Sequence, residues 1–212
     1  MPELPEVETI AADLRPHLVG RTFLRCELRF PTIVRHPEPE VFIDSIVGMR
    51  ITSVGRRGKY ILIRLVDDLV LVVHLGMTGQ LRLMDPATPL VLHTHATFDL
   101  DDGRQLRYRD PRRFGRLLLG TESDLLVAGA MPPLGPEPIA PAFGADDLYQ
   151  RFRTRKALIK AVLLDQSTIA GSRNIYAHES LPPARPRPDR APRNPTKAPG
   201  PLRPAALRRL LP

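Results

Sequence analysis

Cysteine and tryptophan are almost missing from this sequence: Cys26 is the only cysteine among 212 residues, and there is no tryptophan. A single thiol excludes an intrachain disulfide and a zinc site built on several cysteines. Long hydrophobic runs are missing too, because none approaches the ~18 to 20 residues of a membrane-spanning helix, and no charged-then-apolar leader opens the chain. We therefore expect a cytoplasmic protein of bacterial type, with no membrane partner, no cofactor and no bound metal.

Acidic residues are scarce mainly in the C-terminal segment, and that segment decides the net charge. Residues 182–212 hold eight arginines and lysines against Asp189, which gives +7 of the formal charge of +8 and leaves +1 for residues 1–181. The basic character therefore does not by itself mark the whole chain as a nucleic-acid binder. The same segment carries ten prolines and almost no aromatic residue, so we expect it to be a disordered basic tail.

Hydrophobic periodicity predicts an α+β fold for the rest of the chain. Apolar residues at spacings of three and four predict an N-terminal helix over residues 5–18, which Pro16 bends or ends. From about residue 22 to residue 119 the pattern is that of strands, with turns at Asp67-Asp68 and at Asp101-Asp102-Gly103. Short strands at this spacing predict a two-layer β-sandwich. The clearest strand patterns cover residues 60–66, 69–75, 81–84, 96–100, 105–108 and 116–119.

A stretch rich in proline and glycine predicts a domain boundary after the sandwich. We place the sandwich domain at residues 1–131 and a hinge at residues 132–141. Helical patterns at 146–153 and 156–165 then predict a partial helical domain over residues 142–181. The tail, residues 182–212, completes the chain.

The first residues put reactive chemistry at a chain end. Removal of Met1 would expose Pro2 as a secondary amine, and an α-amino group titrates near pH ~7.7 to 8.0, well below a lysine side chain. A helix beginning just after Pro2 disfavours the protonated amine further. Such an amine can attack an aldehyde-like carbon and form an iminium, with Glu3 beside it to move protons. The alternative is that the prolines stiffen the N-terminus and the glutamates only favour a first helical turn.

Three loops in the strand region also carry candidate functional side chains. Residues 56–59 crowd three cations together, which is costly unless an anion such as phosphate approaches. The turn at residues 76–79 pushes Met77 outward, and residues 110–115 alternate Arg and Phe. Exposed Met, Arg and Phe side chains are typical of a wedge that fills an unstacked duplex. The alternative is that Met77 and Phe114 are ordinary core residues.

Three histidines are the remaining metal candidates. His74, His93 and His95 lie in or beside expected strands. Their spacing is a weak signal, because histidines in sheets more often have structural partners than metal ions. The sequence therefore predicts no metal site.

Six short motifs occur in order along residues 1 to about 180. They are Pro2-Glu3-Leu4-Pro5-Glu6-Val7-Glu8, Gly58-Lys59-Tyr60, His74-Leu75-Gly76-Met77-Thr78-Gly79, Asp110-Pro111-Arg112-Arg113-Phe114-Gly115, Leu134-Gly135-Pro136-Glu137-Pro138 and Asn174-Ile175-Tyr176-Ala177. In this order and spacing they resemble the bacterial formamidopyrimidine-DNA glycosylases. Leu4 resembles the branch acting on oxidised purines, because the related endonuclease VIII branch tends to have glycine there.

The resemblance implies a role for each matching residue. Pro2 resembles the Schiff-base nucleophile that attacks C1′ of the damaged nucleotide. Glu3 resembles the family's acid/base residue. Lys59 resembles a lysine that contacts phosphate and donates a proton during β-elimination. The residues that resemble the family's DNA contacts fall into two sets. Met77, Arg112 and Phe114 resemble the triad that fills the gap left by the everted nucleotide, and His93, Arg112, Arg155 and Asn174 resemble phosphate or DNA contacts.

The activity implied is that of a bifunctional glycosylase and AP lyase. It would remove 8-oxoguanine and formamidopyrimidines from damaged double-stranded DNA, as a nucleoid-associated monomer. The alternative is a catalytically inactive remnant, or a protein that binds nucleic acid without specificity.

Two departures from the family pattern bear on that activity. Arg173 stands where the family's helix-two-turns-helix element has a glycine that lets backbone amides approach a phosphate. The family's further helices and its four-cysteine zinc finger have no counterpart after Ser180. We therefore expect a C-terminally truncated or frameshifted chain with impaired activity and without the family's structural zinc.

Overall fold

The structure, a computed structural model, describes residues 2–137, 151, 161–162 and 165–171. The chain forms two compact units, residues 1–131 and residues 132–212. The elements of the first unit are α1 (Leu4–Leu18), β1 (Phe23–Leu28), the 3-10 helix η1 (Pro31–Ile33), β2 (Val34–His36), α2 (Pro39–Ile46), β3 (Ile51–Arg57), β4 (Tyr60–Leu65), β5 (Leu69–His74), β6 (Gln80–Met84), β7 (Thr94–Leu100), β8 (Gln105–Arg109), β9 (Arg116–Thr121) and α3 (Glu122–Val127).

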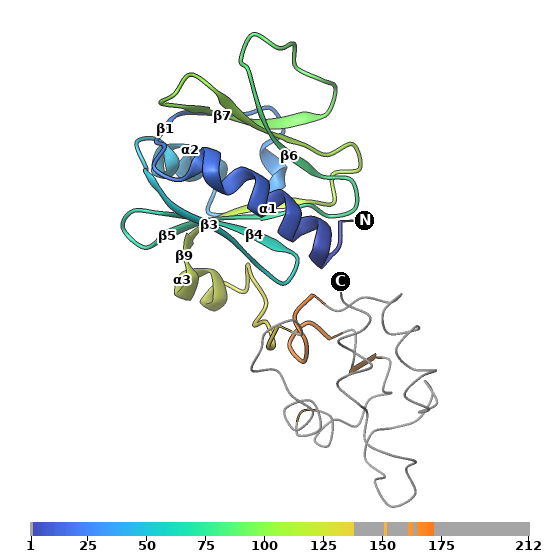
Figure 1. Cartoon of the computed structure of the whole chain (residues 1–212). Helices are drawn as coiled ribbons and strands as arrows, with labels where there is room; N and C mark the ends of the chain where they lie inside the picture. Colours follow the sequence, from blue (N-terminus) through green and yellow to red (C-terminus); the bar gives the residue numbers. More distant parts are fainter. Residues whose placement is uncertain (1, 138–150, 152–160, 163–164, 172–212) are drawn as a thin grey trace, which may run out of the picture. The chain divides into compact units, whose positions relative to one another are not determined.

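Two packed sheets make up the first unit, as the sequence predicts. One sheet has the strand order β1-β7-β8-β6, and the other has the order β2-β9-β5-β4-β3. Figure 1 shows the two sheets as layers, with α1 crossing the side between them. The helix packs mainly on β3 and also contacts β4 and β6, so it touches both sheets. The α+β class and the two-layer sandwich are therefore confirmed.

The core lies between the sheets and follows the strand alternation. In β4 the aliphatic face formed by Ile61, Ile63 and Leu65 belongs to the central cluster, which the period-two pattern predicts. In β5 both Val70 and Val72 are buried although they lie on the opposite face of the sheet from that cluster. The continuous apolar run of β5 thus marks a strand covered on both faces, as predicted.

Helix α1 buries one stripe and continues past its proline. Val7, Leu14 and Leu18 are buried at the spacing that the sequence predicts. Pro16 does not end the helix, which runs on to Leu18, so that part of the prediction is wrong. A proline leaves the carbonyl four residues earlier without its helical hydrogen bond, and Ala12, which carries that carbonyl, is exposed to water together with Pro16.

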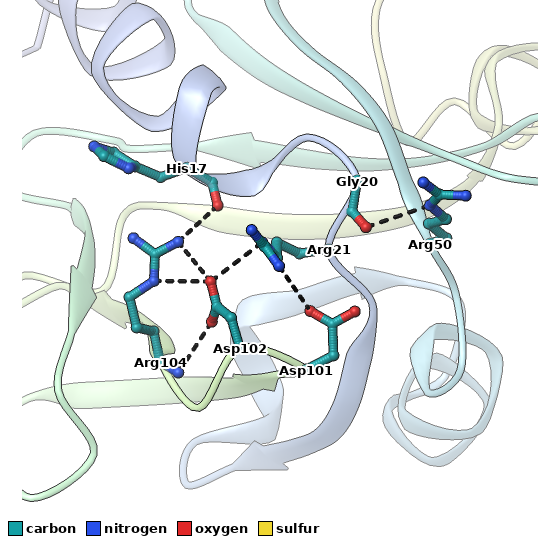
Figure 2. Close-up of polar contacts among 7 residues, drawn as sticks. All are labelled: His17, Gly20, Arg21, Arg50, Asp101, Asp102 and Arg104. Atoms are coloured by element: carbon teal, nitrogen blue, oxygen red, sulfur yellow. Dashed lines mark hydrogen bonds and ion pairs between the residues drawn. The ribbon is translucent and has the colours of Figure 1, made fainter.

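The C-terminal end of α1 is tied to the turn between β7 and β8 (Figure 2). The Arg104 guanidinium donates to the His17 carbonyl (3.0 Å) and to the Asp102 carboxylate (2.9 Å from Nε). Arg21 also lies 3.2 Å from Asp102. The hydrogen bond from Arg104 lowers the pKa of Asp102. A cation on the last carbonyls of a helix is favourable, so this cluster helps to hold α1 in place.

The two predicted hairpin turns are present. Asp67 and Asp68 both have positive φ, at 56° and 58°, and they join the antiparallel strands β4 and β5. Two consecutive positive φ values match the twist of a two-residue hairpin, and aspartate tolerates this conformation better than most residues. Gly103, with φ 80°, closes the turn between β7 and β8.

Helices α2 and α3 were not predicted. The expectation of strands joined by turns and loops from about residue 22 to residue 119 is wrong for residues 39–46, which form α2. The run Val41-Phe42-Ile43 has high β-propensity, but Pro39 starts a helix and Phe42 and Ile46 are both buried, one helical turn apart. In α3 the Thr121 side chain caps the first turn by accepting from the Asp124 N–H.

Within the second unit the described residues form a turn stabilised by one carboxylate. Asp165 accepts from the Ser167 N–H (2.9 Å) and from the Thr168 hydroxyl (3.1 Å). The predicted helix at 146–153 and most of that at 156–165 lie outside the described residues, as do Arg155, Asn174 and the tail. No helix of the described residues is long and apolar enough to cross a membrane.

Candidate functional site

The strand register brings distant stretches of the sequence to one end of the sandwich. Tyr60, His74 and Arg116 are paired in a row across β4, β5 and β9. The chain passes from one sheet to the other at this end three times, through residues 29–33, 75–79 and 110–115. We call this end the rim. The predicted site residues on or beside the rim are Lys59, Met77, His93, Arg112 and Phe114.

Glu3 and Lys59 meet beside the rim. The Lys59 Nζ lies 3.5 Å from the Glu3 Oε2, and the two side chains are only 14% and 1% exposed. Glu3 is the N-cap of α1, and its N–H donates to the Glu6 carboxylate (2.9 Å) as half of a capping box. Pro2 immediately precedes this buried carboxylate and is itself partly exposed. The fold therefore brings a carboxylate and an ammonium together at the start of one helix, next in sequence to Pro2, whose nitrogen would become an amine on removal of Met1.

The anions beside the cation cluster at 56–59 include carboxylates from the protein itself. Arg56 donates from Nε to the Glu8 carboxylate (2.9 Å) and from a terminal nitrogen to the Gly58 carbonyl (2.9 Å). Its side chain is 5% exposed. Lys59 has Glu3 beside it. Carboxylates at the N-cap and in the first turns of α1 therefore approach two of the three cations, and a phosphate contact of this cluster stays a prediction.

His74 is the last residue of β5 and directly precedes the loop that carries Met77. Its ring packs on Tyr60 at 5.0 Å, and its Nδ1 accepts from the Gly76 N–H (3.3 Å). Burial first, and then the charges of Arg116 and Lys59, lower the pKa of His74 from 6.5 to about 4. The ring is therefore neutral near pH 7 and adds no positive charge beside Lys59.

The depressed pKa of His74 predicts acid sensitivity. Below pH 6.5 the imidazole of His74 binds a proton in the unfolded chain, whereas in the folded chain it stays neutral down to about pH 4. The free energy of unfolding is therefore highest above this pH window and falls as the pH drops through it. We expect a loss of about 1 to 2 kcal/mol between pH 7 and pH 5. Denaturant unfolding at a series of pH values measures it. His74→Gln should flatten the slope and His17→Gln, at an exposed site, should not; an unchanged slope in His74→Gln would contradict this account.

The predicted wedge residues are exposed. Met77 is 36% and Phe114 54% exposed, so the alternative that both are core residues is wrong. The Arg112 guanidinium stacks over the Phe114 ring, 4.9 Å from its centroid. A cation on an aromatic face is weakly attractive at an exposed site and limits how both side chains point. The three side chains thus lie on two neighbouring rim loops.

Close backbone contact holds those two loops together. A Cβ atom on Gly76, which has φ +59°, would lie 2.6 Å from the backbone nitrogen of Gly115. Gly76 therefore requires glycine, and so does Gly115, where a Cβ atom would lie 1.7 Å from the Tyr108 hydroxyl oxygen. Sequence reasoning gave no role to Asp110, which is fully buried between the loops. Its place before a proline in a loop that already held a predicted wedge could have drawn attention to it.

His93 and His95 both contact the backbone of Asp110. His93 adopts a left-handed conformation with φ 70°, and its carbonyl accepts from the Asp110 N–H (3.0 Å). The His95 Nε2 is 2.8 Å from the Asp110 carbonyl. The described part of the chain holds no group of three or more residues suited to a metal ion. Arg155 and Asn174 lie outside the described residues, so the structure does not place them.

Comparison with known proteins defines the class. The model of the formamidopyrimidine-DNA glycosylase N-terminal domain matches residues 1–117, and that of the family's H2TH domain matches residues 134–199. The formamidopyrimidine-DNA glycosylase of Desulforamulus reducens is 45% identical over 191 residues, which are 90% of this chain and 69% of the relative. That of Moorella thermoacetica is 46% identical, over 85% of this chain and 66% of the relative.

Solved structures agree. The Lactococcus lactis Fpg bound to DNA with an abasic site matches with a TM-score of 0.81 at 31% identity, over 98% of this chain and 73% of that one. A complex of the same enzyme with Fapy-dG DNA also gives 0.81, over 98% and 75%. The fold is thus that of a DNA glycosylase. This chain belongs to the formamidopyrimidine-DNA glycosylase family, and it spans about two thirds of the length of the curated relatives it matches.

Proposed function

We propose that this chain is a base-excision repair enzyme, a bifunctional glycosylase and AP lyase that removes oxidised purines from double-stranded DNA. The observation that carries the proposal is the buried Glu3 carboxylate, 3.5 Å from Lys59 and adjacent in the chain to Pro2. Support comes from relatives named formamidopyrimidine-DNA glycosylase and from a related structure solved with Fapy-dG DNA. We further propose that it acts in the bacterial cytoplasm, since these relatives are bacterial, and that it acts as a monomer.

The proposed reaction begins at the N-terminal amine. With Met1 removed, the neutral Pro2 nitrogen attacks C1′ of the damaged nucleotide, and the bond from C1′ to the base breaks as the base leaves with its electron pair. Glu3 moves the protons that ring opening and base departure require. The resulting iminium at C1′ acidifies C2′, so loss of a C2′ proton expels the 3′ phosphate by β-elimination. Lys59 stabilises that phosphate and supplies a proton.

The rim residues would hold the DNA during these steps. Met77, Arg112 and Phe114 are exposed on neighbouring loops and can fill the space left by an everted nucleotide. His93 and Arg112 lie on the same rim and would contact phosphates. We propose the same contact role for Arg155 and Asn174, on the family resemblance of their motifs.

A zinc finger of the family's type does not fit the residues of this chain. Cys26 is the only cysteine in the sequence, and it is buried in the sandwich core. Burial, and then the nearby charges of Asp99 and Glu27, raise the pKa of its thiol to about 12. A cysteine that binds a metal as a thiolate needs surroundings that lower the pKa of its thiol. The proposed reaction therefore includes no step through a metal.

Borohydride trapping tests the proposed function. We expect reduction to join the chain covalently to a duplex with an abasic site, because only an iminium is converted to a stable amine. Acetylation of the N-terminus should abolish the adduct, and Pro2→Gly should change its yield, since it replaces a secondary amine with a primary one. A strong adduct from acetylated protein would contradict the Pro2 assignment. No adduct from unblocked protein would instead favour the alternative of a non-catalytic DNA-binding protein.

A further inference from the structure

One buried carboxylate joins the two loops that carry the exposed rim side chains. Asp110 is 0% exposed. Its Oδ1 accepts from the Thr78 hydroxyl at 2.6 Å, and its Oδ2 accepts from the Gly115 N–H at 2.8 Å. The Arg112 N–H lies 3.3 Å from the same Oδ1 and 3.2 Å from the Thr78 oxygen. Thr78 follows Met77 directly, and Gly115 follows Phe114.

The backbone of Asp110 reaches a third segment. Its N–H donates to the His93 carbonyl (3.0 Å), and its carbonyl accepts from the Arg113 N–H (3.2 Å) and lies 2.8 Å from the His95 Nε2. His93 and His95 lie at the start of β7, whereas Arg113 lies in the same loop as Asp110. Moving a buried carboxylate away from several donors costs free energy. Each donor or acceptor that loses its partner stays buried and cannot bond to water instead.

We propose that Asp110 is a positioning residue that makes the Met77 loop and the Arg112–Phe114 loop one rigid wedge, so that they enter a duplex together. The proposal rests on the proposed function for its role on DNA, whereas the coupling of the loops is a property of the protein alone. Asp110 does not touch the reacting atoms. Its effect is to hold Met77 and Phe114 at a fixed separation before DNA arrives, which removes the cost of ordering them on binding.

Amide hydrogen exchange on the free protein tests the coupling. Thr78→Val removes the hydroxyl from one loop, and we expect the Arg112 and Gly115 amides on the other loop to exchange about tenfold faster, while Thr78→Ser restores protection. In Asp110→Asn one carboxylate oxygen becomes an NH₂ group, which cannot accept from the Gly115 N–H in one orientation of the amide or from the Arg112 N–H in the other, so at least one of these two amides should exchange faster. Asp85→Asn is the matched control, because Asp85 also accepts from a backbone N–H two residues on, at Ala87 (2.8 Å), and lies at the opposite end of β6 from the Met77 loop.

The exchange data decide the proposal even if Asp110→Asn does not fold. Faster exchange across the loops in Thr78→Val, with rescue by Thr78→Ser, supports it. Unchanged exchange at Arg112 and Gly115 in Thr78→Val overturns it, because the loops would then be independent. Neither outcome depends on whether the chain has enzymatic activity.

A second measurement concerns the wedge on DNA. A duplex with a stable abasic analogue and 2-aminopurine as the opposite base should brighten when the wedge unstacks that base, and Thr78→Val should reduce the change at least about threefold. The borohydride adduct on a single strand with a preformed abasic site should stay within about twofold of wild type, since it needs no wedge. Equal loss in both assays overturns a role confined to the wedge. Failure of the wild-type adduct overturns the proposed function instead and leaves the exchange result to decide on Asp110.

Discussion

Replacing Glu3 with glutamine is expected to reduce excision of an oxidised purine by at least about 100-fold, while lyase activity on a preformed abasic site falls much less. The leaving base needs a proton, and opening of the sugar ring also needs proton transfer. The amide of glutamine cannot transfer either proton. The aldehyde of an abasic site has already lost its base, so it depends mainly on the Pro2 amine. The measurement compares single-turnover rates on the two substrates.

Glu6→Gln is the control for this experiment. Glu6 forms the other half of the capping box, where its carboxylate accepts from the Glu3 N–H at 2.9 Å. An amide oxygen can accept the same bond, and both variants remove one negative charge from the start of α1. If Glu6→Gln lost as much excision as Glu3→Gln, helix charge rather than proton transfer would explain the result. Equal loss of excision and lyase activity in Glu3→Gln would contradict the separate roles of Glu3 and Pro2.

Replacing Gly115 with alanine is expected to destabilise the sandwich by roughly 3 kcal/mol, near the upper end of the cost of overpacking. The new Cβ would lie 1.7 Å from the Tyr108 hydroxyl oxygen and 2.6 Å from the His74 carbonyl oxygen. Tyr108 is fully buried and its hydroxyl lies 3.4 Å from that carbonyl, so relief requires moving both a core ring and a strand end. Urea or thermal unfolding measures the change.

Gly55→Ala provides the matched comparison. Gly55 lies in β3, and a Cβ there would meet no atom within 4 Å. We expect a change within about 0.5 kcal/mol, or a slight gain because alanine restricts the unfolded chain. A loss in Gly115→Ala no larger than in Gly55→Ala would mean that the rim yields easily, and would count against a rigid arrangement of the two loops.

The sequence determined most of the fold through local patterns. Alternation identified the aliphatic face of β4, and an unbroken apolar run identified β5 as a strand buried on both sides. Short turn motifs located two hairpins, because aspartate and glycine tolerate positive φ. Local patterns failed where propensity and burial disagree: the Val41-Phe42-Ile43 run indicates a strand, but the packing of Phe42 and Ile46 makes it a helix.

Part of the chemistry of the site could also be predicted from the sequence. A proline amine followed by glutamate is a reactive pair by residue type alone, and Met77 and Phe114 stood out in glycine-flanked or arginine-rich loops. Their exposure, however, depends on which face of a loop meets the core. The sequence left that choice open, and the fold settled it.

Only the tertiary structure decided which charges compensate one another. Glu3 meets Lys59 and Glu8 meets Arg56 across about fifty positions of sequence, because α1 packs on β3 and β4. Likewise Asp110 joins Thr78, Gly115 and His93 because the crossings through residues 75–79 and 110–115 fall at the same end of the sandwich as the start of β7. Residue types and short spacings state what a side chain can do. Ion pairs and buried hydrogen bonds between distant positions depend on strand register and helix packing, which exist only once the chain has folded.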